Sequence, residues 1–394
     1  MKTILFVYHA SNIGGGTYCL LNILKEIDRI KYEPIVLLRT SGALVREINN
    51  LGIEVLFMPS MTLVPYNRPL YKRGIVKSYW RIEKSLRDFE NMLKKVNPDA
   101  VYLNTMMLAP YLKVAKESGC RTVIHLREHW PLDEHVFQLS RVQKTIEKFA
   151  DEIIAITQYS ASMVPSRSAT IVHDWIDMSN RYEYRPLDKI LGEDTIILKV
   201  YLFTGGLQDI KGALEIVDVF SNRIKDENTR LLMVGVDPCP NYNGLKNKIR
   251  FFLSKLGYNV YEYSVRKLIS QDKRIVTIPA TYALKHIVEQ AYCNLSFFTI
   301  PHANLALAES IIIGTIPVAA RTPESVEYSH NGECALLFEL GNKDDMYEKL
   351  KYLDTNYDLL KSTIYEKRQH VVDLFDKKKN VATLHGALEK LFNH

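Results

Sequence analysis

One carboxylate stands alone in an otherwise apolar stretch, IPHANLALAESIIIGTIPVAAR, which spans residues 300–321. A strand-like segment and a short turn open the stretch, and the spacing predicts a helix that begins near Leu305. The first amides of such a helix, on Asn304, Leu305 and Ala306, have no partner within it and can bind phosphate oxygens. Glu309 lies one turn further on, where a carboxylate can accept hydrogen bonds from ribose hydroxyls. The stretch therefore predicts a nucleotide-binding helix.

A lysine follows another strand-like segment in LFTGGLQDIKGALEIV, residues 202–217. The pair Gly205 and Gly206 indicates a turn, after which Lys211 is predicted at the start of a helix. An ammonium group at this place can neutralise a departing diphosphate. It would also oppose the dipole of its own helix. This local conflict favours a functional role for Lys211 over that of an exposed surface lysine.

Three consecutive glycines, Gly14, Gly15 and Gly16, follow the first predicted strand. Glycine lets the backbone approach a ligand closely, and the helix that follows offers unpaired amides and a positive dipole end. A phosphate or a negatively charged sugar nucleotide would fit there. The alternative is a tight strand-to-helix turn that binds nothing. The spacing matches neither the dinucleotide motif G-x-G-x-x-G nor the phosphate loop that ends in Gly-Lys-Ser/Thr.

The strand-like segment RTVIHL, residues 121–126, runs directly into charged residues. His125 is predicted at or just past the end of this strand, with Arg127 and Glu128 beside it. A histidine so placed can hydrogen-bond a hydroxyl or support developing charge, although a lone histidine is more often structural. The H-x-x-x-H spacing to His129 lacks the acid that a zinc protease helix carries, so no metal site is predicted.

Strand-like and helix-like segments alternate along the chain, which is typical of an α/β protein with parallel sheets. The alternation restarts after a polar segment near residues 174–195. We therefore predict two tandem Rossmann-like, doubly wound domains facing a central cleft, with boundaries at 1–178 and 179–378. A closing helix over 379–394 is predicted to pack back towards the first domain. Ligands of such sheets bind at the carboxyl ends of the strands, where the residues singled out above occur.

The charge of the 394-residue chain is unevenly distributed. Residues 68–95 hold nine basic and three acidic side chains, and nine minus three equals the +6 of the whole chain. Tyrosines and a tryptophan accompany them, which suits an anionic membrane surface; a solvated helix face is the alternative. No nucleic-acid-binding motif accompanies the charge. Neither a signal peptide nor an 18-residue apolar span is found, so we expect a cytoplasmic protein, peripheral on the inner face of the plasma membrane if the segment binds lipid.

Taken together, these segments resemble the retaining nucleotide-sugar glycosyltransferases of the GT-B fold, the large group often called family 4. The resemblance covers essentially the whole chain. It is carried by IGGGTYCLLNIL, by Asn104-Thr105 with HLRE at 125–128, by VHDWID, by TGGLQDIKG, and by LALAESIIIGTIPVAARTPESVEYSHNGECALLF. The last segment is the most specific, because the family signature there is a Glu, seven residues, a second Glu, a small-residue turn, a Pro-Val strand and a later Asn-Gly.

The resemblance implies a role for residues in the second half of the chain. Glu309 matches the second signature Glu, which holds the nucleotide ribose. The amides of residues 304–306 match the diphosphate-binding turn, and Lys211 matches the lysine that contacts the diphosphate. Thr281 falls where the backbone normally binds the base.

The resemblance also implies roles in the first half. Gly15 and Gly16 match the loop that faces the donor phosphate and the acceptor. His125 matches the residue beside the transferred sugar.

The sequence departs from the family pattern at three places. The first signature Glu, a contact to the donor sugar, is Pro301 here, and the arginine expected five residues before Lys211 is Gly206. The glycine of the usual Asn-Gly-x-Asp is Trp175. His302 could replace the sugar contact. The candidates to replace the missing cation are Arg321, Arg127 and Lys285.

As the resemblance implies, a UDP-, GDP- or dTDP-linked sugar would bind the second domain. A hydroxyl acceptor would approach from the first domain, and a lipid-linked acceptor is one alternative. The leaving diphosphate, stabilised by Lys211 and helix amides, could itself take the acceptor proton, which gives retention without a protein nucleophile, cofactor or metal. The expected role is assembly of bacterial surface polysaccharide, glycolipid or another glycoconjugate. The alternatives are a non-catalytic sugar-binding or scaffolding relative, a sugar-nucleotide epimerase or glycogen-type phosphorylase, and a Rossmann oxidoreductase.

Overall fold

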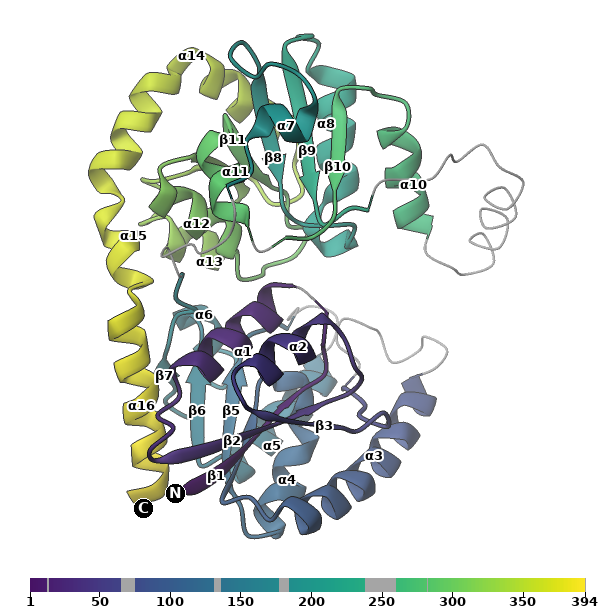
Figure 1. Ribbon diagram of the computed structural model, residues 1–394, viewed down its shortest axis with the longest axis vertical. Coiled ribbons are helices and arrows are strands. Elements are labelled where there is room, and N and C mark those ends of the chain that lie inside the picture. Colours follow the sequence, from purple (N-terminus) through teal and green to yellow (C-terminus); the bar gives the residue numbers. More distant parts are fainter. Residues whose placement is uncertain are drawn as a thin grey trace. The chain divides into compact units, whose positions relative to one another are not determined.

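The computed structural model describes residues 1–12, 14–64, 75–130, 136–176, 184–237, 260–281 and 283–393. The chain divides into two compact units. The first comprises Met1–Trp175 together with Phe375–His394, and the second comprises Ile176–Leu374. Each unit is built on one parallel sheet (Figure 1).

The first unit contains a seven-stranded sheet in the order β3-β2-β1-β4-β5-β6-β7, and every pairing is parallel. Its strands are β1 (Lys2–Tyr8), β2 (Tyr32–Leu38), β3 (Glu54–Phe57), β4 (Ala100–Leu103), β5 (Arg121–Leu126), β6 (Glu152–Ala155) and β7 (Thr170–Ile171). Its helices are α1 (Gly15–Glu26), α2 (Ala43–Asn50), α3 (Ile75–Val96), the 3-10 turn η1 (Met106–Leu108), α4 (Pro110–Glu117), α5 (Val136–Phe149), α6 (Gln158–Ala161) and α16 (Lys377–Asn393).

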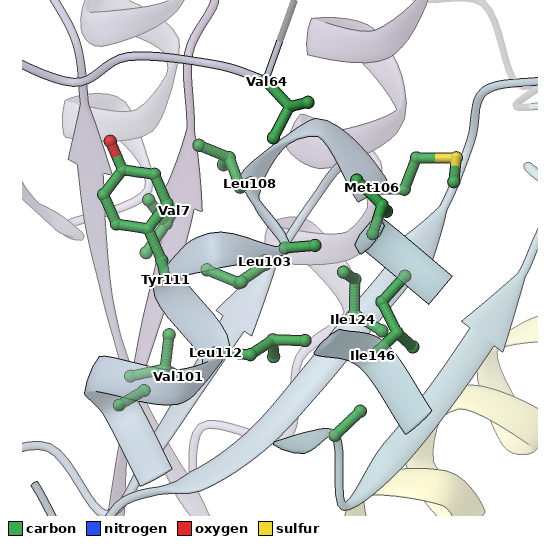
Figure 2. Close-up of a cluster of buried hydrophobic side chains, with 14 of the residues drawn as sticks. Val7, Val64, Val101, Leu103, Met106, Leu108, Tyr111, Leu112, Ile124 and Ile146 are labelled. Carbon is green, nitrogen blue, oxygen red and sulfur yellow. The ribbon is translucent and has the colours of Figure 1, made fainter. Parts of the chain in front are cut away.

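Helices cover both faces of this sheet because its central strands are apolar on both sides. Leu5 and Val7 of β1 point into a core formed with α3, α4 and α5, part of which Figure 2 draws around Tyr111 and Leu112. The alternate residues Ile4 and Phe6 point into the opposite core, which α1, α2 and α16 complete. The sheet is therefore doubly wound.

The last helix of the chain, α16, belongs to the first unit. Leu384, Leu388 and Leu391 are buried in the core that α1 and α2 share. The side chain of Asn380 accepts a hydrogen bond from the His173 amide at 2.9 Å. Figure 1 shows α16 beside β7, which it contacts.

The second unit contains a six-stranded parallel sheet in the order β10-β9-β8-β11-β12-β13. Its strands are β8 (Lys199–Phe203), β9 (Thr229–Val234), β10 (Ile275–Ile278), β11 (Cys293–Ser296), β12 (Ile316–Ala320) and β13 (Leu336–Phe338). Its helices are α7 (Leu187–Leu191), the 3-10 turn η2 (Asp209–Lys211), α8 (Ala213–Arg223), α10 (Val260–Ile269), α11 (Leu284–Gln290), α12 (Leu305–Ile313), α13 (Pro323–Tyr328), α14 (Lys343–Lys367) and α15 (Gln369–Leu374). The predicted fold class, two Rossmann-like parallel-sheet domains in tandem, is thus confirmed.

Part of the polar segment between the halves is helical, and residues 177–183 of it lie outside the described residues. Within residues 174–195 the short helix α7 buries Leu187 against Leu202 and Ile287. The Gln290 side chain accepts a hydrogen bond from the Leu187 amide at 3.0 Å. Ile190 and Leu191 of the same helix are partly buried against this second core.

Candidate active site

Each sheet has one point where the strand order reverses. In the first unit it lies between β1 and β4, and in the second between β8 and β11. At such a point the connections leave in opposite directions, so the loops that follow the two strands separate and leave a crevice at the carboxyl ends. The glycine run follows β1, Lys211 follows β8, and Asn304 follows β11. Sequence-predicted residues therefore occur at both reversal points.

Lys211 ends the 3-10 turn η2 and does not begin a helix, because Gly212 turns the chain before α8 starts at Ala213. The predicted conflict with the helix dipole therefore does not arise. The ammonium nitrogen lies 4.2 Å from the centroid of the Phe298 ring. Partial burial lowers the pKa of Lys211 to about 8. Within the described part of the chain no carboxylate is within ion-pair distance of this lysine, which is suited to meet an anionic ligand.

Two glycines determine where Lys211 lies. Gly212 has a φ of 71°, and a Cβ there would overlap the carbonyl oxygen of Phe297, at the end of β11. The Thr299 amide donates to the carbonyl of Ile210 at 3.1 Å. The loops after β8 and β11 are therefore bound to each other. A Cβ at Gly205 would overlap the Phe203 ring, so the predicted glycine turn is also required by packing.

Gly206, where the resembling family has an arginine, has a φ of 64°. A Cβ there would lie 3.3 Å from the carbonyl oxygen of Gly235. An arginine at this position would need a left-handed backbone and a displaced neighbour. The local backbone geometry thus accounts for the glycine that stands at position 206 in place of the family's arginine.

The helix α12 starts at Leu305, as predicted, with Asn304 as its N-cap; the Asn304 side chain accepts a hydrogen bond from the Leu307 amide. Two buried polar residues of β11 hold this helix. Ser296 accepts from the Asn304 side chain at 2.9 Å, and Asn294 donates to the Ser310 hydroxyl at 2.8 Å and to the Ala306 carbonyl at 3.1 Å. The amides of Leu305 and Ala306 precede the first hydrogen bond of the helix, and these contacts position them at the end of β11.

Glu309 lies one turn into α12, on the face that also carries Leu305. Its side chain is partly buried among apolar groups, and desolvation raises the pKa of its carboxyl group to about 7. No described residue donates a hydrogen bond to this carboxylate. A carboxyl group in apolar surroundings without a donor is suited to accept hydrogen bonds from a ligand.

The other residues predicted in the second unit lie in loops. His302 and Pro301 are partly buried in the turn before α12, and the His302 ring packs 5.3 Å from the Phe298 ring, centroid to centroid. Thr281 follows β10, and its hydroxyl accepts a hydrogen bond from the Ala283 amide at 3.1 Å. His302 and Lys211 thus both contact the ring of Phe298.

In the first unit, the glycine run forms the start of α1. Gly14 is the N-cap, in extended backbone, and Gly15 is the first helical residue. A Cβ at Gly16 would overlap the hydroxyl of Tyr8, the last residue of β1, whereas a Cβ at Gly15 would meet nothing within 4 Å. Gly16 is therefore explained by packing. Gly14 and Gly15 keep the backbone of the helix start accessible.

His125 is the last residue but one of β5, which ends at Leu126, and is fully buried. Its Nδ1 lies 2.7 Å from the Tyr102 hydroxyl and 3.3 Å from an Arg127 nitrogen. The Arg127 guanidinium forms an ion pair with both oxygens of Asp174, at 2.7 and 2.8 Å, and donates to the Asn104 side chain at 2.9 Å. Desolvation, together with the Arg127 charge, keeps the pKa of His125 well below its usual value.

Glu128 and two of the three candidate replacement cations, Arg127 and Lys285, already have partners in the fold. The Glu128 carboxylate is partly buried, caps the turn η1 through Thr105 and the Met106 amide, and has a pKa raised by desolvation. Arg127 is neutralised by Asp174, and Lys285 lies 3.7 Å from Glu289. Arg321 is exposed. Of these three cations, only Arg321 has no carboxylate partner among the described residues.

Sequence reasoning missed the residues that position the site. Asn294 and Ser296 could have been noticed as polar residues within an apolar strand, NLSFFTI. Asn104 and Asp174 were noticed only as parts of matching segments. Nothing in the sequence could pair Asp174 with Arg127, 47 residues away, because that pairing depends on how β5 and the end of β7 lie in the sheet.

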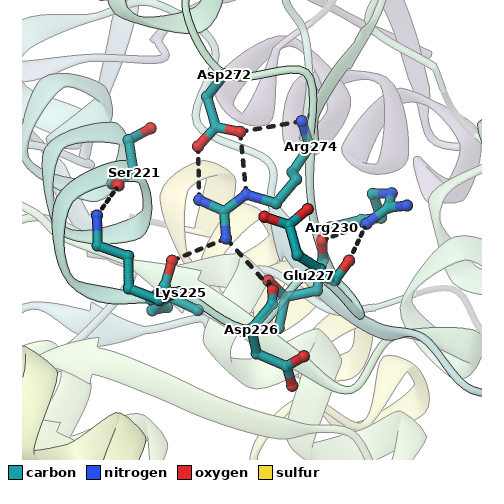
Figure 3. Close-up of polar contacts among 9 residues, drawn as sticks. Ser221, Lys225, Asp226, Glu227, Arg230, Asp272 and Arg274 are labelled. Carbon is teal, nitrogen blue, oxygen red and sulfur yellow. Dashed lines mark hydrogen bonds and ion pairs between the residues drawn. The ribbon is translucent and has the colours of Figure 1, made fainter.

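The second unit also contains a charge cluster around the buried Arg274, at the opposite end of its sheet, which Figure 3 draws. Arg274 precedes β10 and forms an ion pair with Asp272 at 2.8 Å. The same guanidinium donates to the carbonyls of Ile224 and Asp226. This cluster lies at the amino ends of β9 and β10 and joins loops, so we assign it a structural role.

Part of the basic segment 68–95 forms the helix α3, and residues 68–74 lie outside the described residues. Ile82, Phe89 and Leu93 are buried on one face. The opposite face carries Trp80, Lys84, Arg87 and Lys94. Successive residues of this set are four, three and seven positions apart, which is helical spacing. Trp80 is 79% exposed.

Of the described helices, none is long and apolar enough to cross a membrane, and the described residues contain no group of three metal-ligating side chains.

No family model and no curated protein matches the sequence. Solved structures do match over the full length. The UDP-glucose complex of HepE from Anabaena superposes with a TM-score of 0.76 at 17% identity, covering 100% of both chains. A glycosyltransferase from Rickettsia africae gives 0.69 at 16%, covering 100% of this chain and 99% of that one. Sucrose-phosphate synthase from Thermosynechococcus elongatus gives 0.71 at 12%, covering 100% of both. The chain has the GT-B glycosyltransferase fold.

Proposed function

We propose that the protein is a retaining, metal-independent glycosyltransferase that moves a sugar from a nucleotide-sugar donor to a hydroxyl acceptor. The observation that supports it most strongly is the arrangement around β8 and β11. There Lys211, a partly buried lysine, and Glu309, a partly buried carboxylate, flank the start of α12, and neither has an ion-pair or hydrogen-bond partner for its charged group among the described residues. HepE, which superposes on the whole chain, was crystallised with UDP-glucose.

In this proposal each group contacts one part of the donor. Glu309 accepts hydrogen bonds from the ribose, and the first amides of α12 bind the diphosphate. Lys211 neutralises the charge that develops as the bond between the sugar and the diphosphate breaks. The diphosphate oxygen that is released takes the proton of the acceptor hydroxyl, which then attacks the same face of the sugar. Lysine and helix amides supply the positive charge, so no metal or other cofactor is required.

The proposal is tested by measuring turnover of a nucleotide-sugar donor. UDP-, GDP- and dTDP-linked sugars are first screened for binding by thermal shift, and the donor that binds is incubated with acceptor candidates. Release of free nucleoside diphosphate together with a glycosylated product is the expected result, and the anomeric configuration of that product decides retention. Absence of nucleotide binding across the screen would contradict the proposal.

A non-catalytic relative of the same fold is the second candidate, favoured by Gly206 and Pro301, which replace two usual donor-site residues. A glycine with a φ of 64° stands where the resembling enzymes have a diphosphate-binding arginine. This candidate predicts that a nucleotide-sugar binds but releases no diphosphate. The turnover measurement therefore separates the two functions.

We further propose that the acceptor is lipid-linked and that the protein acts in surface polysaccharide or glycolipid assembly at the inner face of the plasma membrane. The support is the exposed face of α3, where Trp80, Lys84 and Arg87 are adjacent. An aromatic side chain beside basic residues suits an interface with anionic lipid.

A further inference from the structure

The first unit contains a pocket of about 210 Å³ at the amino ends of β5, β6 and β7. The candidate site residues of this unit lie at the carboxyl ends of its strands, so the pocket is at the other end of the same sheet. Lys390 and Leu391, in the last turn of α16, complete its wall. Every residue that lines the pocket belongs to the first unit and is described.

The alternation of side chains along a strand explains how two charged groups reach this pocket. Arg121 begins β5, and Glu152 begins β6 opposite Val123. Because Arg121 and Val123 are two residues apart, Arg121, Val123 and Glu152 share one face of the sheet. Val123 is buried in the core that α16 completes. The sheet therefore directs the Arg121 guanidinium and the Glu152 carboxylate to the side on which α16 packs.

Both carboxylates in the pocket already have partners. The Asp151 carboxylate forms an ion pair with Lys116, which does not line the pocket. The Glu152 carboxylate accepts a hydrogen bond from the Thr170 hydroxyl at 2.6 Å, and the Lys390 ammonium lies 3.9 Å from it. Neither acidic group therefore depends on a ligand.

The two arginines of the pocket, Arg121 and Arg167, differ from the carboxylates. Among the described residues no carboxylate lies within ion-pair distance of either guanidinium, although both arginines are partly buried. Arg167 donates to the carbonyls of Glu147 and Ala150, at 3.0 and 3.3 Å, which holds its guanidinium in place. Counted with Lys116, the pocket has four basic and two acidic side chains, and four minus two leaves an excess of two positive charges.

This excess suits a phosphate group. Cations that line one pocket repel each other, and an anion bound among them removes the repulsion. Arginine donates paired hydrogen bonds to phosphate oxygens, and a phosphate monoester carries about −1.5 to −2 charges at pH 7. Seven of the ten lining residues are polar or charged, which favours a water-soluble ligand over a lipid. The pocket is smaller than the roughly 300–1,000 Å³ of sites for drug-sized ligands, so the ligand must be compact.

We infer that this pocket binds the phosphate group of a small, water-soluble phosphate monoester, and that the bound phosphate joins α16 to the amino ends of β5 and β7. Arg121 binds it from β5, Arg167 from the segment before β7, and Lys390 from α16. The site is separate from the nucleotide-sugar site, so the inference does not depend on the proposed function.

Binding is measured by calorimetric titration of the full-length protein with ribose 5-phosphate and with inorganic phosphate, at an ionic strength held constant with NaCl. We expect saturable binding that Arg121→Gln weakens roughly tenfold or more, because charge-assisted hydrogen bonds are lost. The fold should tolerate this variant, since Arg121 has no hydrogen-bond or ion-pair partner among the described residues. Lys390→Gln should weaken binding as well. The matched control is Arg46→Gln, which removes an exposed arginine of α2 in the same unit and should bind as the wild type does.

Phosphate could also reach the nucleotide site of the second unit, and Lys211→Ala separates the two sites. This variant should still bind ribose 5-phosphate through Arg121, and Arg121→Gln should keep the wild-type affinity for UDP. Loss of all nucleotide binding in a protein that still binds ribose 5-phosphate would contradict the proposed function and leave this inference standing.

The link to α16 is measured by hydrogen exchange. Ribose 5-phosphate should slow amide exchange in residues 384–391 of α16 and leave α4 unchanged, and Lys390→Gln should reduce the slowing. Three results would overturn the inference: a response to phosphate no different from that to NaCl, unweakened binding in Arg121→Gln, and unchanged exchange in α16. Binding of phosphatidic acid vesicles through Arg121, without binding of ribose 5-phosphate, would overturn it too, because the ligand would then be a lipid headgroup.

Discussion

Gly212 lies so close to Phe297 that any side chain at position 212 would overlap the Phe297 carbonyl oxygen. This contact joins the loop after β8 to the end of β11 and places Lys211 over the Phe298 ring. The two loops that flank the reversal point of the second sheet are therefore one rigid unit. Lys211 and the start of α12 should move together when this contact is disturbed.

Gly212→Ala should consequently destabilise the protein by about 1–3 kcal/mol, because it combines a left-handed φ with overlap. Nucleotide affinity should fall as well, since Lys211 and α12 lose their fixed relation. Denaturant unfolding and nucleotide titration measure the two effects. Gly386→Ala is the control, because a Cβ at Gly386 meets nothing within 4 Å. A stable Gly212→Ala protein with unchanged nucleotide affinity would contradict the proposed link.

Glu309→Gln should change how stability depends on pH. Burial raises the pKa of Glu309 to about 7, against an ordinary value of 4.5 in the unfolded chain. Its contribution to the free energy of unfolding is therefore fully present below pH 4.5 and is lost as the pH rises through 7. The wild type should lose more stability than Glu309→Gln between these values. If urea unfolding gives the same pH dependence of the free energy of unfolding for the wild type and Glu309→Gln, the carboxyl group is not buried as described.

Glu309→Ala should weaken nucleotide binding by about 1.5–3 kcal/mol, because hydrogen bonds to a charged acceptor are lost. The fold should survive, since no described residue depends on this carboxylate for a hydrogen bond. Calorimetric titration with the nucleotide that binds the wild type measures the effect. Unchanged nucleotide affinity would show that Glu309 of α12 does not bind the ribose.

Lys211→Ala should reduce kcat more than it reduces affinity for a nucleoside monophosphate, because the lysine charge is needed mainly as the diphosphate departs. With a pKa of about 8, the wild-type lysine loses its charge above that pH. We therefore expect kcat/KM to decline above about pH 8, and this decline should move to higher pH in Lys211→Arg. Equal losses in kcat and in monophosphate affinity would indicate a structural role.

The triple variant Trp80→Ala, Lys84→Gln, Arg87→Gln should lose binding to anionic vesicles while keeping its nucleotide affinity. Each basic residue near such a surface contributes about 1 kcal/mol, and the binding should weaken as salt rises. Cosedimentation with phosphatidylserine-containing and neutral vesicles measures it. Arg46→Gln, Lys144→Gln removes two exposed charges from α2 and α5 and serves as the control. If the wild type does not bind anionic vesicles at low salt, the basic face of α3 is a solvated helix face and not a membrane-binding surface.

The sequence by itself determined the architecture and the positions of the site segments. Alternating strand and helix periods predict parallel sheets, and parallel sheets place the residues after their strands at one edge. The start of α12 and the isolated Glu309 were therefore visible from local spacing. Glycine runs likewise indicated the turns after β1 and β8, although not that Gly16 and Gly212 are required by Tyr8 and Phe297.

Only the tertiary structure decided how the candidate side chains are used. Arg127 could have been a free cation for a diphosphate, but Asp174 neutralises it in the fold. His125 could have been an acid–base group, but it is fully buried between Tyr102 and Arg127, and desolvation together with the Arg127 charge keeps its pKa well below the usual value. Charge state and tautomer depend on burial and on partners distant in sequence. Local spacing carries no information on either.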